Sequence, residues 1–126
     1  MKRIIAFASC LLMGMSICGC TSKIDYSDNQ YIGAAGSEYS VAVTDSNYVT
    51  QVMVFLFNPD GTGGWGYAST ARDDVLGDTF HYTISGGVNV SFTEDTSGGK
   101  GSGYFTTFSD SGQCFVTSGL IFYRIQ

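Results

Sequence analysis

Few side chains in this 126-residue sequence are suited to catalysis. His81 is the single histidine, so there is no histidine cluster for a metal and no spare base beside a Ser-His-Asp arrangement. It alternates with Phe80 and Tyr82, which would share the other face of a strand, and we interpret it as an exposed or hydrogen-bonded strand residue. We therefore predict no catalytic residue and no cofactor, and we expect that the protein is not an enzyme.

Acidic residues occur in short groups that could in principle hold a hard cation. Calcium needs several oxygen ligands held by a tight loop. The turn over residues 58–61 and the carboxylates near residue 73 offer fragments of such a loop without its spacing. We interpret these carboxylates as solvated loop residues, with a calcium site as the less favoured alternative, and predict no metal site. They are Asp73, Asp74, Asp78, Glu94 and Asp95.

The beginning of the chain has the layout of an export signal. Lys2 and Arg3 precede an apolar or small run over residues 4–17. This run is shorter than the roughly 20 apolar residues that a membrane-spanning helix needs, and the layout is typical of a secretory signal. The run ends in Ile17-Cys18-Gly19-Cys20, which resembles the bacterial lipobox. The resemblance implies that residues 1–19 are cleaved as a lipoprotein signal peptide; an ordinary cleaved signal peptide is the alternative.

The lipobox resemblance implies that Cys20 is lipidated and anchors the protein to a lipid bilayer. Two or three acyl chains make a lasting anchor, whereas one chain binds only marginally. Residue 21 is Thr rather than Asp, which favours the outer membrane. We therefore expect a lipid-anchored protein of the cell envelope, on the periplasmic face or at the cell surface.

The other cysteines argue against an intramolecular disulfide, and the net charge argues against a nucleic-acid partner. Cys10 and Cys18 would leave with the signal, so Cys114 has no partner for an intramolecular disulfide, and we expect it to be a buried, inert thiol. The net charge is −5; without Lys2 and Arg3, four basic residues face eleven acidic ones, which gives −7. A nucleic-acid partner is not expected, because phosphate binding needs clustered Lys and Arg.

The remaining chain reads as one all-β domain behind a tether. Residues 20–37 are polar and aperiodic, and we interpret them as the lipidated cysteine and a flexible stalk, although Tyr31 and Ile32 could instead join a first strand. Residues 38–126 then form the domain. Only residues 70–78 could hold a helical turn. Strands are predicted at 38–44, 49–57, 62–69, 79–85, 88–92, 103–109, 113–117 and 120–125.

Tight turns separate these strands and favour a meander. Asn58-Pro59-Asp60-Gly61 and Gly86-Gly87 have the residues that hairpin turns need. Seven or eight short antiparallel strands joined in this way predict an up-and-down barrel, with a β-sandwich as the alternative.

Three stretches of sequence carry a resemblance to a family. FLFNPDGTG, FHYTISGGVNVSF and the final LIFYRI are similar to the small lipocalin-like (calycin-type) lipoproteins of Bacteroidetes, a family of unknown function. The match covers about residues 50–126 and implies an eight-stranded meander barrel. The Gly-x-Trp element with which such chains begin is missing, since the only tryptophan is Trp65. This departure leaves open whether the barrel is complete and whether it forms a ligand cup.

The aromatic side chains suggest two uses beyond core packing. Lining a partly open barrel, they would form an apolar pocket, with Trp65, Tyr67 and Tyr82 as candidate wall residues. Exposed on a sheet face, they would form a surface for a sugar or a protein. We therefore expect a non-enzymatic binding module for a small apolar or glycan-related ligand. The alternative is a structural or protein-interaction subunit, or an inhibitor, that serves an envelope complex.

Overall fold

The computed structural model describes residues 24–68 and 76–126, which form eight strands and one short 3-10 turn at Ser109–Ser111. Within these residues, no helix is long and apolar enough to cross a membrane. The strands are β1 (Ser37–Thr44), β2 (Thr50–Phe57), β3 (Thr62–Ala68), β4 (Leu76–Ser85), β5 (Asn89–Glu94), β6 (Lys100–Phe108), β7 (Gly112–Thr117) and β8 (Leu120–Arg124).

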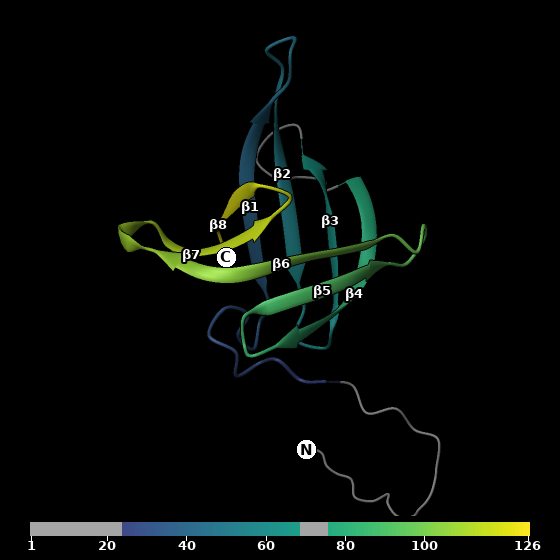
Figure 1. Ribbon diagram of the computed structural model, residues 1–126, viewed down its shortest axis with the longest axis vertical. Helices are drawn as coiled ribbons and strands as arrows, with labels where there is room; N and C mark the ends of the chain where they lie inside the picture. Colours follow the sequence, from purple (N-terminus) through teal and green to yellow (C-terminus); the bar gives the residue numbers. More distant parts are fainter. Residues whose placement is uncertain (1–23, 69–75) are drawn as a thin grey trace, which may run out of the picture.

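The strands form a closed antiparallel barrel in sequence order, which confirms the all-β meander and excludes the sandwich. Every strand pairs with the next, and β1 closes the barrel on β8 through the pairs Tyr39–Arg124 and Ser40–Tyr123. Figure 1 shows β1, β2 and β3 running upright while β5, β6 and β7 cross in front of them. The barrel is thus flattened into two layers that face each other across the core.

Alternation along the strands produces an aromatic core. In β4 and β5, Phe80, Tyr82, Val90 and Phe92 are buried, whereas the residues between them are exposed or half-buried. This is the period of two that places alternate side chains on the two faces of a strand. Rings from both layers then meet in the middle: Phe55 lies 5.2 Å from Phe115 and 5.1 Å from Phe122 between ring centroids.

Glycines make room for these rings on neighbouring strands. Gly101 is paired with Phe92, and a Cβ atom at Gly101 would lie 2.4 Å from the Phe92 ring. Gly63 is paired with Phe80, and a Cβ atom there would lie 2.5 Å from that ring. The rings therefore lie across the backbone of the adjacent strand, which is how aromatic residues cover glycines in sheets.

One end of the barrel is closed by residues 24–36, for which the predicted flexible stalk is wrong. The predicted signal peptide, Cys20 and the first residues of that stalk lie outside the described residues. Ile32 is fully buried, and Tyr26 and Tyr31 are nearly so. Tyr26 stacks on Tyr82 at 5.3 Å and Tyr31 stacks on Phe105 at 5.1 Å, measured between ring centroids. The polar composition of the segment concealed three apolar side chains that the open barrel end can bury. They lie in turns rather than in a first strand.

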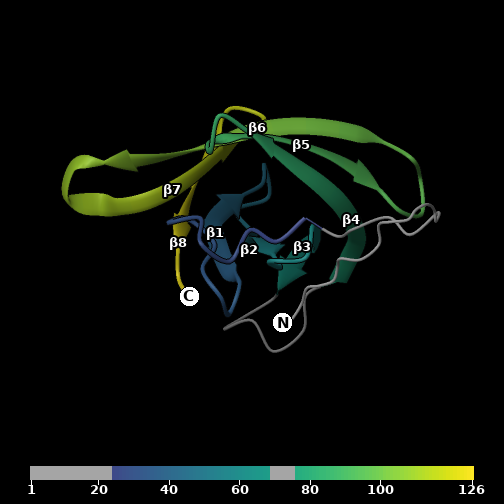
Figure 2. The same ribbon diagram turned by 90° about the horizontal axis from the view of Figure 1, so that it is seen from below.

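Hydrogen bonds hold residues 24–36 at the closed end of the barrel. Figure 2 shows the barrel from below, with this segment in view. The Tyr26 backbone N–H donates to the Pro59 carbonyl (2.8 Å), and the Asn29 side chain donates to the Gly87 carbonyl (3.1 Å). The Tyr39 hydroxyl donates to the Tyr31 carbonyl (2.7 Å), and burial raises the pKa of Tyr39 to about 12. Residues 24–36 are therefore part of the folded domain.

Two strands begin three residues earlier than predicted. β4 begins at Leu76, so residues 76–78 are strand; the rest of the suggested helical turn, including Asp73 and Asp74, lies outside the described residues. β6 begins at Lys100 rather than at residue 103. The start of β6 has no apolar alternation, but it pairs with β5 because its glycines accept the rings of that strand.

Candidate functional site

The end of the barrel opposite residues 24–36 holds an apolar cup. It lies where β5 and β7 end and where β2, β6 and β8 begin, and its volume is about 250 Å³. Its apolar lining consists of Met53, Phe55, Trp65, Phe92, Leu120 and Phe122. Thr117 and Ser118 border it at the turn between β7 and β8. The cup is thus a partly open extension of the barrel core.

Ring contacts fix the floor of the cup. Phe55 contacts all three other aromatic side chains of the lining: Trp65 at 6.3 Å, Phe92 at 5.8 Å and Phe122 at 5.1 Å between centroids. Phe55 is 3% exposed and Phe122 is fully buried. Because these rings are held from both layers, the floor is preformed rather than dependent on a ligand.

Glu94 is the charged side chain that β5 directs to this face. The indole N–H of Trp65 donates to its Oε2 (2.7 Å), and the Ser97 hydroxyl donates to its Oε1 (2.6 Å). Cross-strand pairing of Phe80 with Glu94 places the Glu94 side chain on the inner face of the sheet. Both carboxylate oxygens are therefore held in place beside the ring of Trp65.

Two other charged residues, Lys100 and Asp78, lie near the cup on opposite faces of the sheet. Lys100 borders it, but Lys100 pairs with Thr93 on the outer face and also lines an outer groove with Ser91 and Ser102. Asp78 pairs with Trp65 across β3 and β4, so it shares the face of Trp65 near the same end. Two carboxylates, Glu94 and Asp78, therefore lie on the inner face at this end.

The structure brings one of the three candidate wall residues into the cup. Trp65 lines it. Tyr67 contacts Trp65 at 6.1 Å between centroids, but it is 38% exposed and does not line the cup. Tyr82 lies at the closed end, where its hydroxyl donates to the Asn58 carbonyl and burial raises its pKa. Alternation alone could not separate them, because all three point inward at different heights along the barrel.

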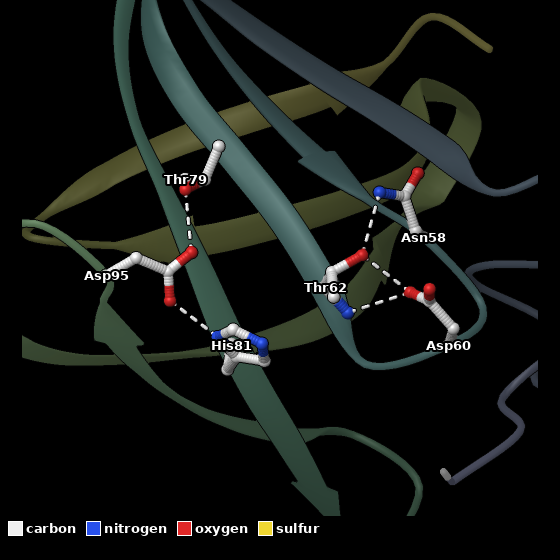
Figure 3. A network of polar contacts seen from close by, with 6 residues as sticks. All are labelled: Asn58, Asp60, Thr62, Thr79, His81 and Asp95. Atoms are coloured by element: carbon white, nitrogen blue, oxygen red, sulfur yellow. Dashed lines mark hydrogen bonds and ion pairs between the residues drawn. The ribbon is translucent and has the colours of Figure 1, made fainter.

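His81 belongs to an outer-face contact and not to the cup (Figure 3). Its Nδ1 lies 2.5 Å from Asp95 Oδ1, and the Thr79 hydroxyl donates to Asp95 Oδ2 (2.6 Å). The bond from Thr79 holds the pKa of Asp95 below its ordinary value, and His81 acts in the same direction. These contacts join β4 to the turn that follows β5, which is a structural role.

The acidic turn over residues 58–61 is also structural (Figure 3). Asp60 Oδ1 accepts the backbone N–H of Thr62 (3.0 Å) and its hydroxyl (2.6 Å). The Asn58 amide donates to the same Thr62 hydroxyl (3.1 Å). These bonds cap the hairpin between β2 and β3. In the part of the chain that the structure describes, no group of three His, Cys, Asp or Glu side chains is arranged to hold a metal ion.

Cys114 is a free thiol and fully buried, as predicted. Its Sγ contacts the Gly112 carbonyl at 3.5 Å. It pairs with Tyr123 and alternates with Phe115, which places it on the outer side of β7 and away from the cup. The thiol is therefore no part of the candidate site.

Glu94 is the site residue that the sequence interpretation placed wrongly, in a polar loop. A signal was present in the alternation of Val88, Val90, Phe92 and Glu94, which puts a carboxylate on an otherwise apolar face. No local sequence pattern could have shown that Leu120 and Phe122 line the cup, because β8 reaches the cup only through closure of the barrel.

In the comparisons with known proteins, no family model, no curated protein and no solved structure matches this chain. The eight-stranded antiparallel barrel is consistent with a lipocalin-like fold. An assignment of function therefore rests on the sequence and geometry of this chain alone.

Proposed function

We propose that this protein is a lipid-anchored, non-enzymatic binding module of the lipocalin-like lipoprotein type, which takes a small apolar ligand or an apolar part of a glycan-related one. The observation behind this proposal is the preformed aromatic cup at one barrel end. Such pockets are typically lined by apolar side chains with a few polar groups that orient the ligand. Here Glu94, Thr117 and Ser118 would supply those groups.

The size of the cup limits the ligand. Its volume of about 250 Å³ compares with roughly 150 Å³ for a protein cavity that holds benzene and with about 300 Å³ or more for most ligand pockets. A single ring or a short hydrocarbon branch fits. A larger ligand would leave its remainder in solvent, beyond the turns at Ser97 and Ser118.

The position of the lipid anchor would set the orientation of the cup relative to the bilayer. Cys20 lies four residues before Ile24, and four extended residues span at most about 14 Å. Ile24 borders a hollow with Pro59 and Asp60 at the closed barrel end. An anchor at Cys20 would therefore hold the closed end near the bilayer, and ligands would reach the cup from the aqueous side.

Filling the cup tests the binding function. Leu120→Phe places a ring in the cup, and we expect it to reduce the affinity for cyclohexanol at least ten-fold in a titration followed by emission of Trp65, the only tryptophan. Ile121→Phe is the matched control: Ile121 pairs with Val116 on the outer face, so it should bind as the wild type does. Equal affinities in all three proteins, each with an unchanged far-UV circular dichroism spectrum, would refute ligand binding in the cup.

An interaction subunit is the second candidate, and one surface favours it. Tyr104, Val116 and Ile121 are paired in a row across the outer face of β6, β7 and β8, beside Tyr123. Tyr104 is 46% exposed and Tyr123 is 40% exposed. A photo-reactive residue at position 104 should cross-link one envelope protein if this face binds a partner, and the same residue at position 81 should not. Absence of a specific product at position 104 would oppose this candidate.

A further inference from the structure

The cup combines aromatic rings with one fixed carboxylate, and we infer that its ligand carries a cationic nitrogen, as a small organic ammonium with apolar substituents does. This inference rests on the proposed function, because it names the class of ligand for the same cup.

The aromatic rings of the cup favour a cationic ligand. Trp65, Phe55, Phe92 and Phe122 border the cup, and the ring contacts described above hold them together. The face of an aromatic ring has negative electrostatic potential, and tryptophan attracts cations most strongly. Cages of such rings recognise quaternary ammonium groups, whose methyl groups also bury apolar surface.

Glu94 adds a fixed negative charge beside these rings. Trp65 and Ser97 each donate to one of its oxygens, so the carboxylate is fixed beside the rings instead of moving freely in solvent. A carboxylate can accept about four hydrogen bonds, and two of these positions are used here. The others remain available to an N–H group, and the negative charge is offset neither by Trp65 nor by Ser97, because both are neutral donors.

Of the basic side chains among the described residues, Lys100 alone borders the cup, and it makes no ion pair with Glu94. The register directs Lys100 to the outer face with Thr93. Arg124 lies at the closed end, where it donates to the Gln30 carbonyl (3.2 Å), and His81 contacts Asp95 outside the barrel. Asp78 shares the inner face with Trp65 and adds to the negative potential. The net charge of −5 would draw a cation toward the protein.

Three probes with the same ring and different charge test this inference on the full domain: cyclohexyltrimethylammonium, cyclohexanol and cyclohexanecarboxylate. We expect the cation to bind at least ten-fold more tightly than cyclohexanol, and the anion to bind most weakly. Glu94→Gln keeps an oxygen for the Trp65 bond and removes the charge. It should lower affinity for the cation at least ten-fold and leave that for cyclohexanol within two-fold. Asp110→Asn, an exposed charge in the 3-10 turn at the closed end, is the control and should change neither.

The outcomes separate this inference from the proposed function. Binding of cyclohexanol that is as tight as binding of the cation, or unaffected cation binding in Glu94→Gln, would overturn the cationic class while the apolar cup remains supported. Preference for the anion that is lost in Lys100→Met would overturn it as well, because the Lys100 ammonium would then reach the cup. Failure of all three probes to bind would overturn both proposals.

Discussion

At the scale of single residues, the carboxylates of this barrel differ in what holds them. Glu94 is fixed by two neutral donors on the inner face, and Asp60 accepts two hydrogen bonds from Thr62 within its own hairpin turn. Asp95 is held by Thr79 and His81 on the outside. Residue type alone did not separate these roles, since all three carboxylates lie at or beside the end of a strand.

Asp95 should make the stability of the barrel depend on acid pH. Its pKa is lower in the folded state than the ordinary value of about 4, chiefly because of the bond from Thr79. The stabilisation is therefore present above about pH 4 and is lost as the pH falls through the folded-state pKa. In urea unfolding, Asp95→Asn should lose less unfolding free energy between pH 7 and about pH 2.5 than the wild type loses.

Asp110→Asn serves as the control for this measurement, since no hydrogen bond within the described residues involves the Asp110 side chain. It should lose the same unfolding free energy over this pH range as the wild type. If Asp95→Asn also matches the wild type, the contacts of Asp95 do not contribute to acid sensitivity.

At the scale of elements, residues 24–36 act as the plug of the barrel. Tyr26, Tyr31 and Ile32 are the buried side chains with which this segment closes the barrel end. The segment contributes stacking to β4 and β6 and hydrogen bonds to the turns after β2 and β4. Each of these contacts joins parts of the chain that are distant in sequence.

Truncating Ile32 tests whether the plug stabilises the barrel. Ile32 is fully buried, so Ile32→Ala should lower the free energy of unfolding by about 2–5 kcal/mol in urea denaturation. Ile24→Ala is the matched control, because Ile24 is 52% exposed and the same truncation there should change stability by no more than about 0.5 kcal/mol. Equal effects of the two substitutions would show that residues 24–36 are not packed in solution.

At the scale of the whole molecule, the two ends of the barrel have different roles. One end is closed by residues 24–36, and the other holds the cup with Trp65. In the proposed orientation the cup is turned away from the membrane. The ligand would then be one that is present in the aqueous phase and not one extracted from the bilayer that holds the anchor.

Fluorescence quenching by nitroxide-labelled lipids tests this orientation in vesicles that carry the lipidated protein. Trp65 should be quenched little, because it lies in the barrel above the plug. Ile24→Trp in a Trp65→Phe background should be quenched several-fold more. The Cys20→Ala variant should not bind vesicles; binding by this variant would contradict lipidation of Cys20. Equal quenching of the two tryptophan positions in the anchored protein would contradict only the orientation.

Much of the fold could be predicted from local pattern. The alternation of Phe80, Tyr82, Val90 and Phe92 and the turn residues at Gly61, Gly86 and Gly87 determined a meander of short strands, because strand period and hairpin geometry depend on neighbours in sequence. The number of strands favoured a barrel over a sandwich, but only the pairing of β1 with β8 decided that it is closed. The start of β6 and the packing of Ile32 could not be predicted, because both depend on surfaces that exist only once distant strands meet.

The sequence by itself determined the lipobox-like beginning, the antiparallel meander of strands and the burial of Cys114. Tertiary structure decided that Trp65 and Tyr82 lie at opposite ends, that residues 24–36 close one of them, and that Glu94 lies beside Trp65. The physical reason is that alternation fixes which face a side chain occupies but not its height along the barrel. That height is set by the register between strands and by which end the chain itself plugs.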